Sequence, residues 1–217
     1  MKIVTAKKIL VANDQIASRN RDRFNRAGVL TVNIVGSPGC GKTTLLEALF
    51  AKLGGRVAPA VIEGDLASSI DAERIERLGI PVVQINTMGA CHLDASMVAE
   101  AVEGIPLDHV KVLVIENVGN LVCTAGFDLG EHLRVVILSV SEGDDKVAKY
   151  PTIFRKSDVL VITKTDVLPN SNFQVDRVKE DLRRLAPNAR VFLVSALADQ
   201  GVDELADWIV ESAATPR

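Results

Sequence analysis

The sequence predicts an α/β fold: a three-layer α/β/α sandwich with a mostly parallel sheet of about seven strands. Helix-like stretches, at residues 69–78, 94–102, 173–185 and 202–212, separate most of the short apolar, largely β-branched runs that recur along the 217-residue chain. This alternation is typical of a parallel sheet covered by helices on both faces. The runs that predict strands are residues 30–35, 57–62, 82–85, 110–115, 135–140, 159–163 and 191–194.

The chain begins with a polar, helix-like stretch at residues 6–27, which stops at Gly28. We expect residues 1–28 to form an N-terminal helical lead-in. The sequence after it holds no repeat, low-complexity tract or long Pro/Gly/Ser linker, and its 47% hydrophobic content suits one full core. Residues 29–217 are therefore expected to form one globular domain.

The overall composition indicates which kinds of partner and which cellular location to expect. A net charge of −3, with one Trp and one Tyr, gives no basic surface and little for base stacking, so nucleic acid is not expected as a partner. The N-terminal residues lack an apolar signal core, and no stretch has the length of a membrane span. We expect a cytoplasmic protein without a membrane partner, whose three cysteines are thiols or metal ligands rather than disulfides.

A glycine-rich loop follows the first predicted strand. Its sequence, Gly36-Ser37-Pro38-Gly39-Cys40-Gly41-Lys42-Thr43, matches the phosphate-binding pattern G-x-x-x-x-G-K-[ST] at every fixed position, and Thr44 and an amphipathic helix follow it. The glycines allow backbone N–H groups to surround phosphate oxygens, Lys42 reaches the β- and γ-phosphates, and the Thr43 hydroxyl suits Mg²⁺. The pattern predicts a nucleotide site of the P-loop NTPase type.

Carboxylates end two of the predicted strands. Glu63-Gly64-Asp65 follows residue 62, and Glu116-Asn117-Val118-Gly119 follows residue 115. Ligands of open α/β sheets bind at the carboxyl ends of strands, so we expect Thr43, Asp65 and Glu116 to bind Mg²⁺, and Lys42, Asp65 and Glu116 to serve catalysis. Asp71 is either a catalytic candidate or the cap of the next helix.

Another strand ends in Thr163-Lys164-Thr165-Asp166. The Asp166 carboxylate can accept hydrogen bonds from two donors on a guanine edge, and the Lys164 stem can cover the base. Adenine offers no matching pair of donors, so the sequence favours GTP.

Two thiols and an imidazole follow neighbouring predicted strands, at Cys91-His92 and at Cys123. Their spacing alone favours packed cysteines over a metal site. However, Cys123 lies seven residues beyond Glu116, in the segment that should respond to the γ-phosphate. Thiolates with an imidazole suit Ni²⁺ or Zn²⁺ and disfavour Mg²⁺. We therefore expect an exchangeable transition metal here.

The ordered motifs resemble those of the GTPases that pair two subunits across bound nucleotide. Within that class the Cys91-His92…Cys123 set resembles the HypB family, the hydrogenase nickel-incorporation GTPases, over nearly the whole chain. The resemblance implies that Gly119, Ser195 and Ala196 also contact the nucleotide. The guanine motif usually has Asn where this chain has Thr163, so the amide that ties that motif to the phosphate loop is expected to be missing.

The same resemblance implies a slow, Mg²⁺-dependent GTPase metallochaperone. In this reading, GTP favours a homodimer in which the Cys91-His92-Cys123 sets approach, and hydrolysis releases nickel to the nickel-iron hydrogenase precursor with a second nickel accessory protein. Lys146 or Lys149 would touch the nucleotide or carboxylates of the second subunit. The chain lacks the N-terminal cysteine motif and the histidine-rich stretch of some family members.

Other interpretations remain open from the sequence. The chain could serve another metallocentre, such as urease nickel or a cobalamin enzyme, or act as a regulatory switch with Cys91 and Cys123 merely packed. A P-loop small-molecule kinase would need an acceptor pocket and an arginine lid. Arg183-Arg184 could belong to such a lid, but a solvated helix face is the simpler interpretation of this pair. Cys40 is expected to be structural, and His109 and His132 to lie away from the ligand edge.

Overall fold

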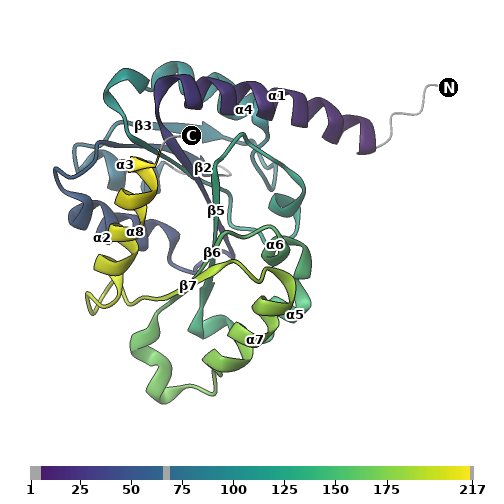
Figure 1. Cartoon of the computed structure of the whole chain (residues 1–217), viewed down its shortest axis with the longest axis vertical. Helices are drawn as coiled ribbons and strands as arrows, with labels where there is room; N and C mark the ends of the chain where they lie inside the picture. The colour runs from purple at the N-terminus through teal and green to yellow at the C-terminus, as the bar shows by residue number, and fades with distance from the viewer. Residues whose placement is uncertain (1–5, 66–68, 216–217) are drawn as a thin grey trace.

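The central feature of the fold is a seven-stranded sheet in which every pair of neighbouring strands is parallel (Figure 1). The computed structural model describes residues 6–65 and 69–215. Across the sheet the strand order is β3-β2-β4-β1-β5-β6-β7. The strands are β1 (Leu30–Gly36), β2 (Pro59–Asp65), β3 (Val82–Asn86), β4 (Val112–Glu116), β5 (Leu133–Ser139), β6 (Val159–Thr163) and β7 (Arg190–Leu193).

Helices cover both faces of this sheet, which confirms the predicted three-layer architecture (Figure 1). Helices α2 and α8 pack together on one face, while α1 and α4 lie side by side on the other. The α-helices are α1 (Ala6–Ala27), α2 (Lys42–Leu53), α3 (Ile70–Glu76), α4 (Ala95–Ala101), α5 (Lys146–Lys149), α6 (Pro151–Arg155), α7 (Val175–Leu185) and α8 (Val202–Ala214). Short 3₁₀ turns are η1 (Val102–Gly104), η2 (Leu107–His109), η3 (Cys123–Gly126), η4 (Val140–Glu142) and η5 (Thr165–Asn170).

The strands are mostly apolar, and β4 shows the reason, because its residues are buried on both faces of the sheet. In β4, Val112 and Val114 belong to the core beneath α2 and α8, whereas Leu113 and Ile115 belong to the core beneath α1 and α4. Successive side chains of a strand point to opposite faces, so both sets must be apolar. The same alternation decides which face each polar residue reaches at the end of a strand.

The strand boundaries differ from the sequence prediction where polar residues continue a strand. Strand β2 runs on to Asp65 instead of stopping at residue 62, since Glu63 pairs with Glu116 of β4 and Asp65 pairs with Asn86 of β3. The backbone ladder continues regardless of side-chain polarity. Helices α5 and α6 lie in a stretch where we predicted no helix, and Pro151 occupies the first turn of α6, where proline is tolerated.

Buried side-chain amides hydrogen-bond helix α1 to backbone carbonyls elsewhere in the chain. Asn13 Nδ2 donates to the carbonyl of Asp128, and Asn20 Nδ2 donates to the carbonyls of Ala95 and Leu129. Residues 1–5 of the predicted lead-in lie outside the described residues, and the domain boundary at residue 28 stays a prediction. Across the described part of the chain, none of the helices combines the length and apolar character needed to span a bilayer.

Candidate functional site

The phosphate loop connects the end of β1 to the start of α2. Gly39 and Gly41 adopt φ angles of 73° and 93°, which glycine reaches without strain. A side chain on Gly36 would also collide, because its Cβ would lie 2.6 Å from the Cys40 sulfur. Gly41 is the N-cap of α2 and has no side chain with which to occupy the first N–H groups of the helix. These N–H groups form an anion site at the positive end of the helix dipole.

Two carboxylates lie behind this loop in the sheet. Glu116 Oε1 accepts a hydrogen bond from the Thr43 hydroxyl at 2.8 Å. Glu63 is its register partner on β2, and both side chains are only 3% exposed. Among the described residues, the Oε2 atoms of Glu63 and Glu116 are buried without a hydrogen-bond partner. Such oxygens are costly to bury unless a cation or another donor meets them.

The pKa values of the two carboxyl groups reflect this environment. Burial raises the pKa of Glu116 to about 7, against the opposing pull of the Lys42 charge. The pKa of Glu63 rises to about 8, through burial first and then through repulsion from Glu116 and Asp65. Burial and mutual repulsion therefore favour the protonated form of both groups unless a further cation approaches them.

Glu63 is a candidate site residue that the sequence analysis did not select. We placed it just after a strand, whereas it lies within β2, two positions before Asp65. Residues two apart share a face of a strand, so Glu63 and Asp65 reach the same side of the sheet. Extending the strand pattern through Glu63-Gly64-Asp65 would have revealed the pair.

Asp71 does not cap the helix that follows β2. The N-cap of α3 is Ser69, and Asp71 lies in the first turn of the helix. Its carboxylate pairs with Arg74 at 3.1 Å. The Arg74 guanidinium also bonds Glu47 and the hydroxyl of Thr44 in α2. The cap interpretation is therefore wrong, and Asp71 lies on a helix that is tied to the start of the phosphate-loop helix.

The predicted guanine motif, Thr163-Lys164-Thr165-Asp166, lies at a cavity beside the phosphate loop. Ser195 Oγ donates to Asp166 Oδ1 at 2.5 Å, which orients the carboxylate. Lys164 has a φ of 58°, and its amine donates to the carbonyl of Gly39 at 2.8 Å. The cavity measures about 370 Å³ and is lined by Gly41, Thr44, Leu45, Thr163, Lys164, Asp166, Val167, Ser195, Ala196 and Leu197.

The expected loss of contact between the guanine motif and the phosphate loop does not occur. The Thr163 hydroxyl donates to the carbonyl of Cys40 at 2.7 Å, within the phosphate loop. We expected this connection to be missing because Thr163 has no amide group. The Thr163 hydroxyl, at the end of β6, makes it instead. Cys40 itself is fully buried, and burial raises the pKa of its thiol to about 11, in line with a structural role.

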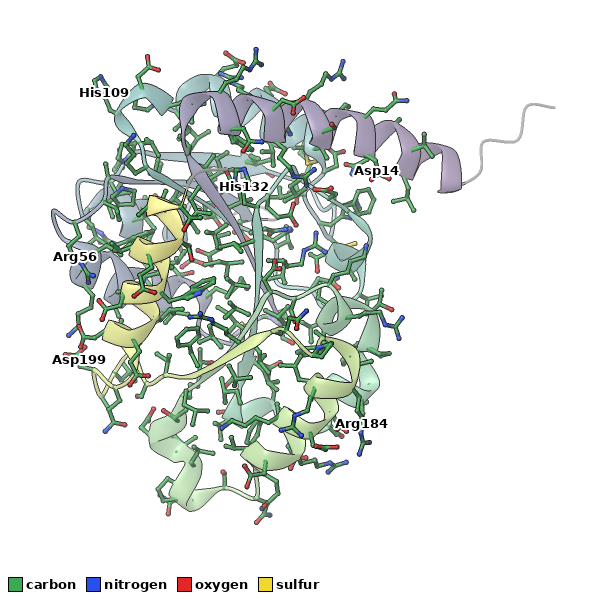
Figure 2. The ribbon with its side chains drawn as sticks, viewed as in Figure 1. Asp14, Arg56, His109, His132, Arg184 and Asp199 are labelled. Carbon is green, nitrogen blue, oxygen red and sulfur yellow. The ribbon has the colours of Figure 1, made fainter. Side chains whose placement is uncertain are left out.

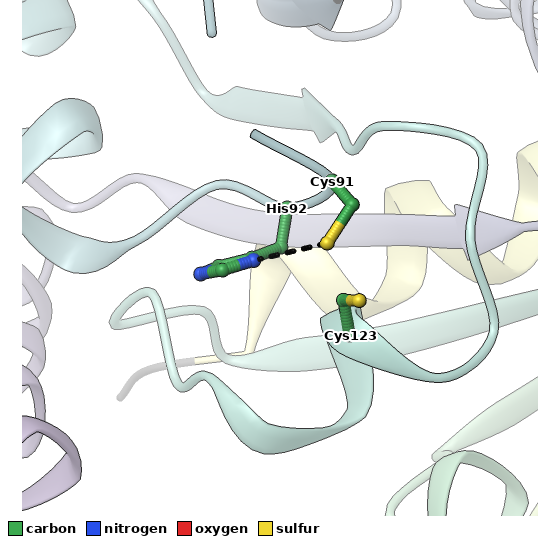
Figure 3. A group of neighbouring side chains, drawn as sticks. All are labelled: Cys91, His92 and Cys123. Carbon is green, nitrogen blue, oxygen red and sulfur yellow. Dashed lines mark hydrogen bonds between the residues drawn. The ribbon is translucent and has the colours of Figure 1, made fainter. Parts of the chain in front are cut away.

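Cys91, His92 and Cys123 lie together, as Figure 3 shows. One ligand atom from each falls within 4.8 Å of the other two, and Cys91 Sγ is 3.7 Å from His92 Nδ1. We expected the two loops that carry them to follow neighbouring strands, but they follow β3 and β4, which β2 separates in the sheet. All three side chains are partly exposed, so an ion can reach them.

Neighbouring groups contact two of the three candidate ligands, His92 and Cys123. The His92 ring stacks on Phe127 with centroids 3.9 Å apart, and burial lowers its pKa. Asn120 Oδ1 accepts a hydrogen bond from the Cys123 backbone N–H at 3.0 Å. A hydrogen bond to Cys91 is the main cause that raises the pKa of Cys123. Neutral imidazole is the form that binds metal, whereas the thiols must lose protons.

The remaining candidates lie elsewhere, as Figure 2 shows for the two labelled histidines near α1 and for Arg184 on α7. His132 Nδ1 accepts from the Thr31 backbone N–H at the start of β1, away from the phosphate loop. Arg184 pairs with Glu180 of its own exposed helix face, which gives no support to an arginine lid. Lys149 pairs with Asp145, and Lys146 lies 5.6 Å from the Tyr150 ring centroid.

A phosphate loop between the first strand and the following helix of a parallel sheet defines the class of P-loop NTPases. The family model described as "CobW/HypB/UreG, nucleotide-binding domain" matches residues 30–193. The hydrogenase maturation factor HypB of Escherichia coli (strain K12) is 45% identical over 201 residues, which cover 93% of this chain and 69% of the relative. The chain belongs to the CobW/HypB/UreG family of P-loop GTPases, and within it to the hydrogenase maturation factors HypB.

Two solved structures share the fold at similar identity. HypB from Helicobacter pylori, solved in complex with nickel, has a TM-score of 0.89 and 40% identity, covering 93% of this chain and 95% of that chain. HypB from Archaeoglobus fulgidus has a TM-score of 0.87 and 37% identity, covering 94% of this chain and 99% of that chain. The HypB assignment therefore rests on both sequence and fold.

Proposed function

We propose that this chain is a GTP-hydrolysing metal carrier that binds Ni²⁺ through Cys91, His92 and Cys123 and delivers it during maturation of a nickel-iron hydrogenase. The observation that carries the proposal is the convergence of these three ligands within 4.8 Å, beyond the same sheet edge that carries the phosphate loop. The nickel complex of the Helicobacter pylori relative supports nickel as the cargo. Zn²⁺ suits the same ligands and is the competing metal.

In the proposed nucleotide complex, Lys42 and the loop N–H groups bind the phosphates of GTP. Asp166 reads the guanine edge, in the orientation that Ser195 gives it, and the Lys164 stem covers the base. The full proposed nucleotide set is Gly36, Ser37, Pro38, Gly39, Cys40, Gly41, Lys42, Thr43, Thr44, Gly119, Thr163, Lys164, Asp166, Ser195 and Ala196.

The residues present fit a magnesium ion. Among the described residues, two buried carboxylate oxygens have no hydrogen-bond partner, one on Glu63 and one on Glu116, and Glu116 also accepts from the Thr43 hydroxyl. Hard oxygen ligands of this kind suit Mg²⁺. We propose that Thr43, Asp65 and Glu116 hold it, with Glu63 as a further carboxylate. Bound there, Mg²⁺ supplies charge neutralisation at the phosphate oxygens.

Catalysis in this proposal depends on the residues around the phosphates. Lys42 stabilises negative charge on the β- and γ-phosphates, while Asp65 and Glu116 act through the metal and its water shell. Asp71 is proposed to orient the attacking water, and its pairing with Arg74 holds the carboxylate until GTP arrives. Since the proposal assigns no arginine to the phosphates in addition to Lys42 and Mg²⁺, hydrolysis should be slow in the isolated chain.

The proposed delivery cycle needs partners. Three ligands leave one position of a four-coordinate metal open, which a second copy of the chain or an accepting protein can fill. We propose a homodimer promoted by GTP, a hydrogenase precursor as the recipient and a second nickel accessory protein. Residues 29–217 would supply the GTPase domain and residues 1–28 the helical lead-in.

A metal titration tests the carrier function. Ni²⁺ is titrated into the full chain and into Cys91→Ala and Cys123→Ala, with His109→Ala as a control for loss of an exposed imidazole outside the group. Each cysteine variant should bind Ni²⁺ at least about tenfold more weakly, since a strong ligand is lost, while GTP binding is kept. Metal affinities equal to that of the unmodified chain would refute the carrier function.

A further inference from the structure

A continuous row of buried polar side chains runs through the sheet beside the metal group. Asn117 Nδ2 donates to Asn33 Oδ1 at 3.3 Å, and Asn33 Nδ2 donates to Glu131 Oε1 at 3.1 Å. Arg134 Nε donates to the same Glu131 oxygen at 2.9 Å. All four side chains are buried. We call Asn117, Asn33, Glu131 and Arg134 the polar row.

The polar row fixes His92 from two sides. Asn117 Oδ1 accepts a hydrogen bond from the backbone N–H of Leu93, the residue after His92, at 3.2 Å. At the other end, Arg134 Nη2 donates to the carbonyl of Phe127 at 2.7 Å, and the Phe127 ring stacks on His92. A shift of Asn117 must therefore change the position of the imidazole or break one of these contacts.

Asn117 also begins a short segment that adjoins the phosphate loop. Glu116, the residue before Asn117, accepts a hydrogen bond from the Thr43 hydroxyl. The Asn117 backbone N–H donates to the carbonyl of Ile34 in β1 and so continues the backbone ladder between the two strands. Gly119 packs so closely on Pro38 that a Cβ there would lie 3.0 Å from the Pro38 Cα. Successive side chains at the end of an extended strand point to opposite faces. One peptide unit thus connects the phosphate side to the metal side.

A contribution to the stability of the fold does not by itself explain why the four residues of the polar row are polar. Buried ion pairs and amides cost desolvation, and well-packed apolar residues often serve a core equally well. A fully bonded polar network does fix one arrangement of its members. Two sites can influence each other only when a ligand at one favours an arrangement that differs at the other. The hydrogen bonds described above give the polar row such an arrangement, with Arg134 Nη1 as its one buried atom that has no hydrogen-bond partner among the described residues.

We propose that Asn117 is a positioning residue that couples the nucleotide state to metal affinity. Contact of the γ-phosphate with residues 116–119 shifts Asn117, and its bond to Leu93 N–H moves His92 relative to Cys91 and Cys123. This inference rests on the proposed function, because it needs nucleotide at the phosphate loop and metal at the Cys/His group. It assigns the coupling to a residue that contacts neither ligand.

The test measures Ni²⁺ affinity of the full chain with Mg·GDP and with a non-hydrolysable Mg·GTP analogue. The unmodified chain should show a ratio between the two states of at least about fivefold. Asn117→Ala should bring the ratio below about twofold while both nucleotides still bind. Asn20→Ala is the matched control: it removes a buried amide with two backbone partners but leaves the bond to Leu93 N–H, so its ratio should match the unmodified chain.

Each other outcome has a defined meaning. An unchanged ratio in Asn117→Ala, or an equal loss in Asn20→Ala, overturns the inference. Equal Ni²⁺ affinity of the unmodified chain in both nucleotide states also overturns it but leaves the carrier function standing, whereas no Ni²⁺ binding at all removes both. If thermal denaturation shows that Asn117→Ala does not fold, Asn117→Leu decides, since it keeps a similar side-chain volume but cannot accept the hydrogen bond from the Leu93 N–H. An unchanged ratio in that variant overturns the inference.

Discussion

The hydrogen bond from Thr163 to the carbonyl of Cys40 gives a sharp test of how the guanine motif is joined to the phosphate loop. Thr163→Val removes the hydroxyl and keeps the shape of a β-branched side chain. The Cys40 carbonyl then lies buried without its 2.7 Å donor. A buried acceptor that loses its partner costs about 1–3 kcal/mol of unfolding free energy. For a chain of this size, each kcal/mol lowers the melting temperature by about 2–4 °C.

A matched control lies on another strand of the same sheet. Thr31 is also buried on a strand, but among the described residues its hydroxyl oxygen has no hydrogen-bond partner. Thr31→Val removes an unpartnered polar atom and should be neutral or stabilising by up to about 1 kcal/mol. Urea denaturation of the nucleotide-free chain measures both variants. Equal unfolding free energies for Thr163→Val and Thr31→Val would refute the reasoning, and Thr163→Asn should retain most of the stability.

Two further predictions concern the base and the buried carboxylates. Asp166→Asn should weaken GTP binding by about 10–100-fold, through loss of charge-assisted hydrogen bonds, and should shift preference toward xanthosine triphosphate; competition binding that still favours GTP would contradict the assignment. Glu63 has a folded-state pKa near 8 against an ordinary value of 4.5, so its ionisation opposes folding. Stability of the nucleotide-free chain should therefore fall as the pH rises from about 4.5 through 8, and Glu63→Gln should remove on the order of 3 kcal/mol of that loss; identical pH profiles in urea denaturation would contradict it.

The strands and the phosphate loop were predictable because they follow local rules. A buried parallel strand reads as an apolar run, and the loop pattern between a strand and a helix has few other interpretations. The two thiols and the imidazole could be selected from their residue types. That they approach within 4.8 Å could not be read from the sequence, because it depends on how two loops on either side of β2 fold over the sheet edge.

The features that the sequence did not predict are contacts between distant residues. Thr163 and Cys40 are 123 positions apart, and Asn33 and Asn117 are 84 positions apart. Neither bond leaves a periodic signal, since each depends on the order of strands in the sheet. Glu63 is hidden for a different reason: a polar residue after an apolar run predicts the end of a strand, whereas β2 continues through Glu63 to Asp65. In a sheet whose carboxyl edge binds ligands, polar residues belong inside the last positions of the strands.

The placement of both loops with candidate metal ligands around residues 117–120 limits how the proposed carrier can work. Asn117 holds the backbone next to His92, and Asn120 holds the backbone of Cys123. A change in this segment therefore acts on ligands from both loops at once. Coupling between two binding sites is reciprocal, so nucleotide that changes nickel affinity must itself be bound with an affinity that nickel changes by the same factor. If nickel binds more tightly in the GTP state, the loaded chain also favours GTP over GDP. Conversion of the bound GTP to GDP would then lower the nickel affinity by that same factor, which favours release of the metal.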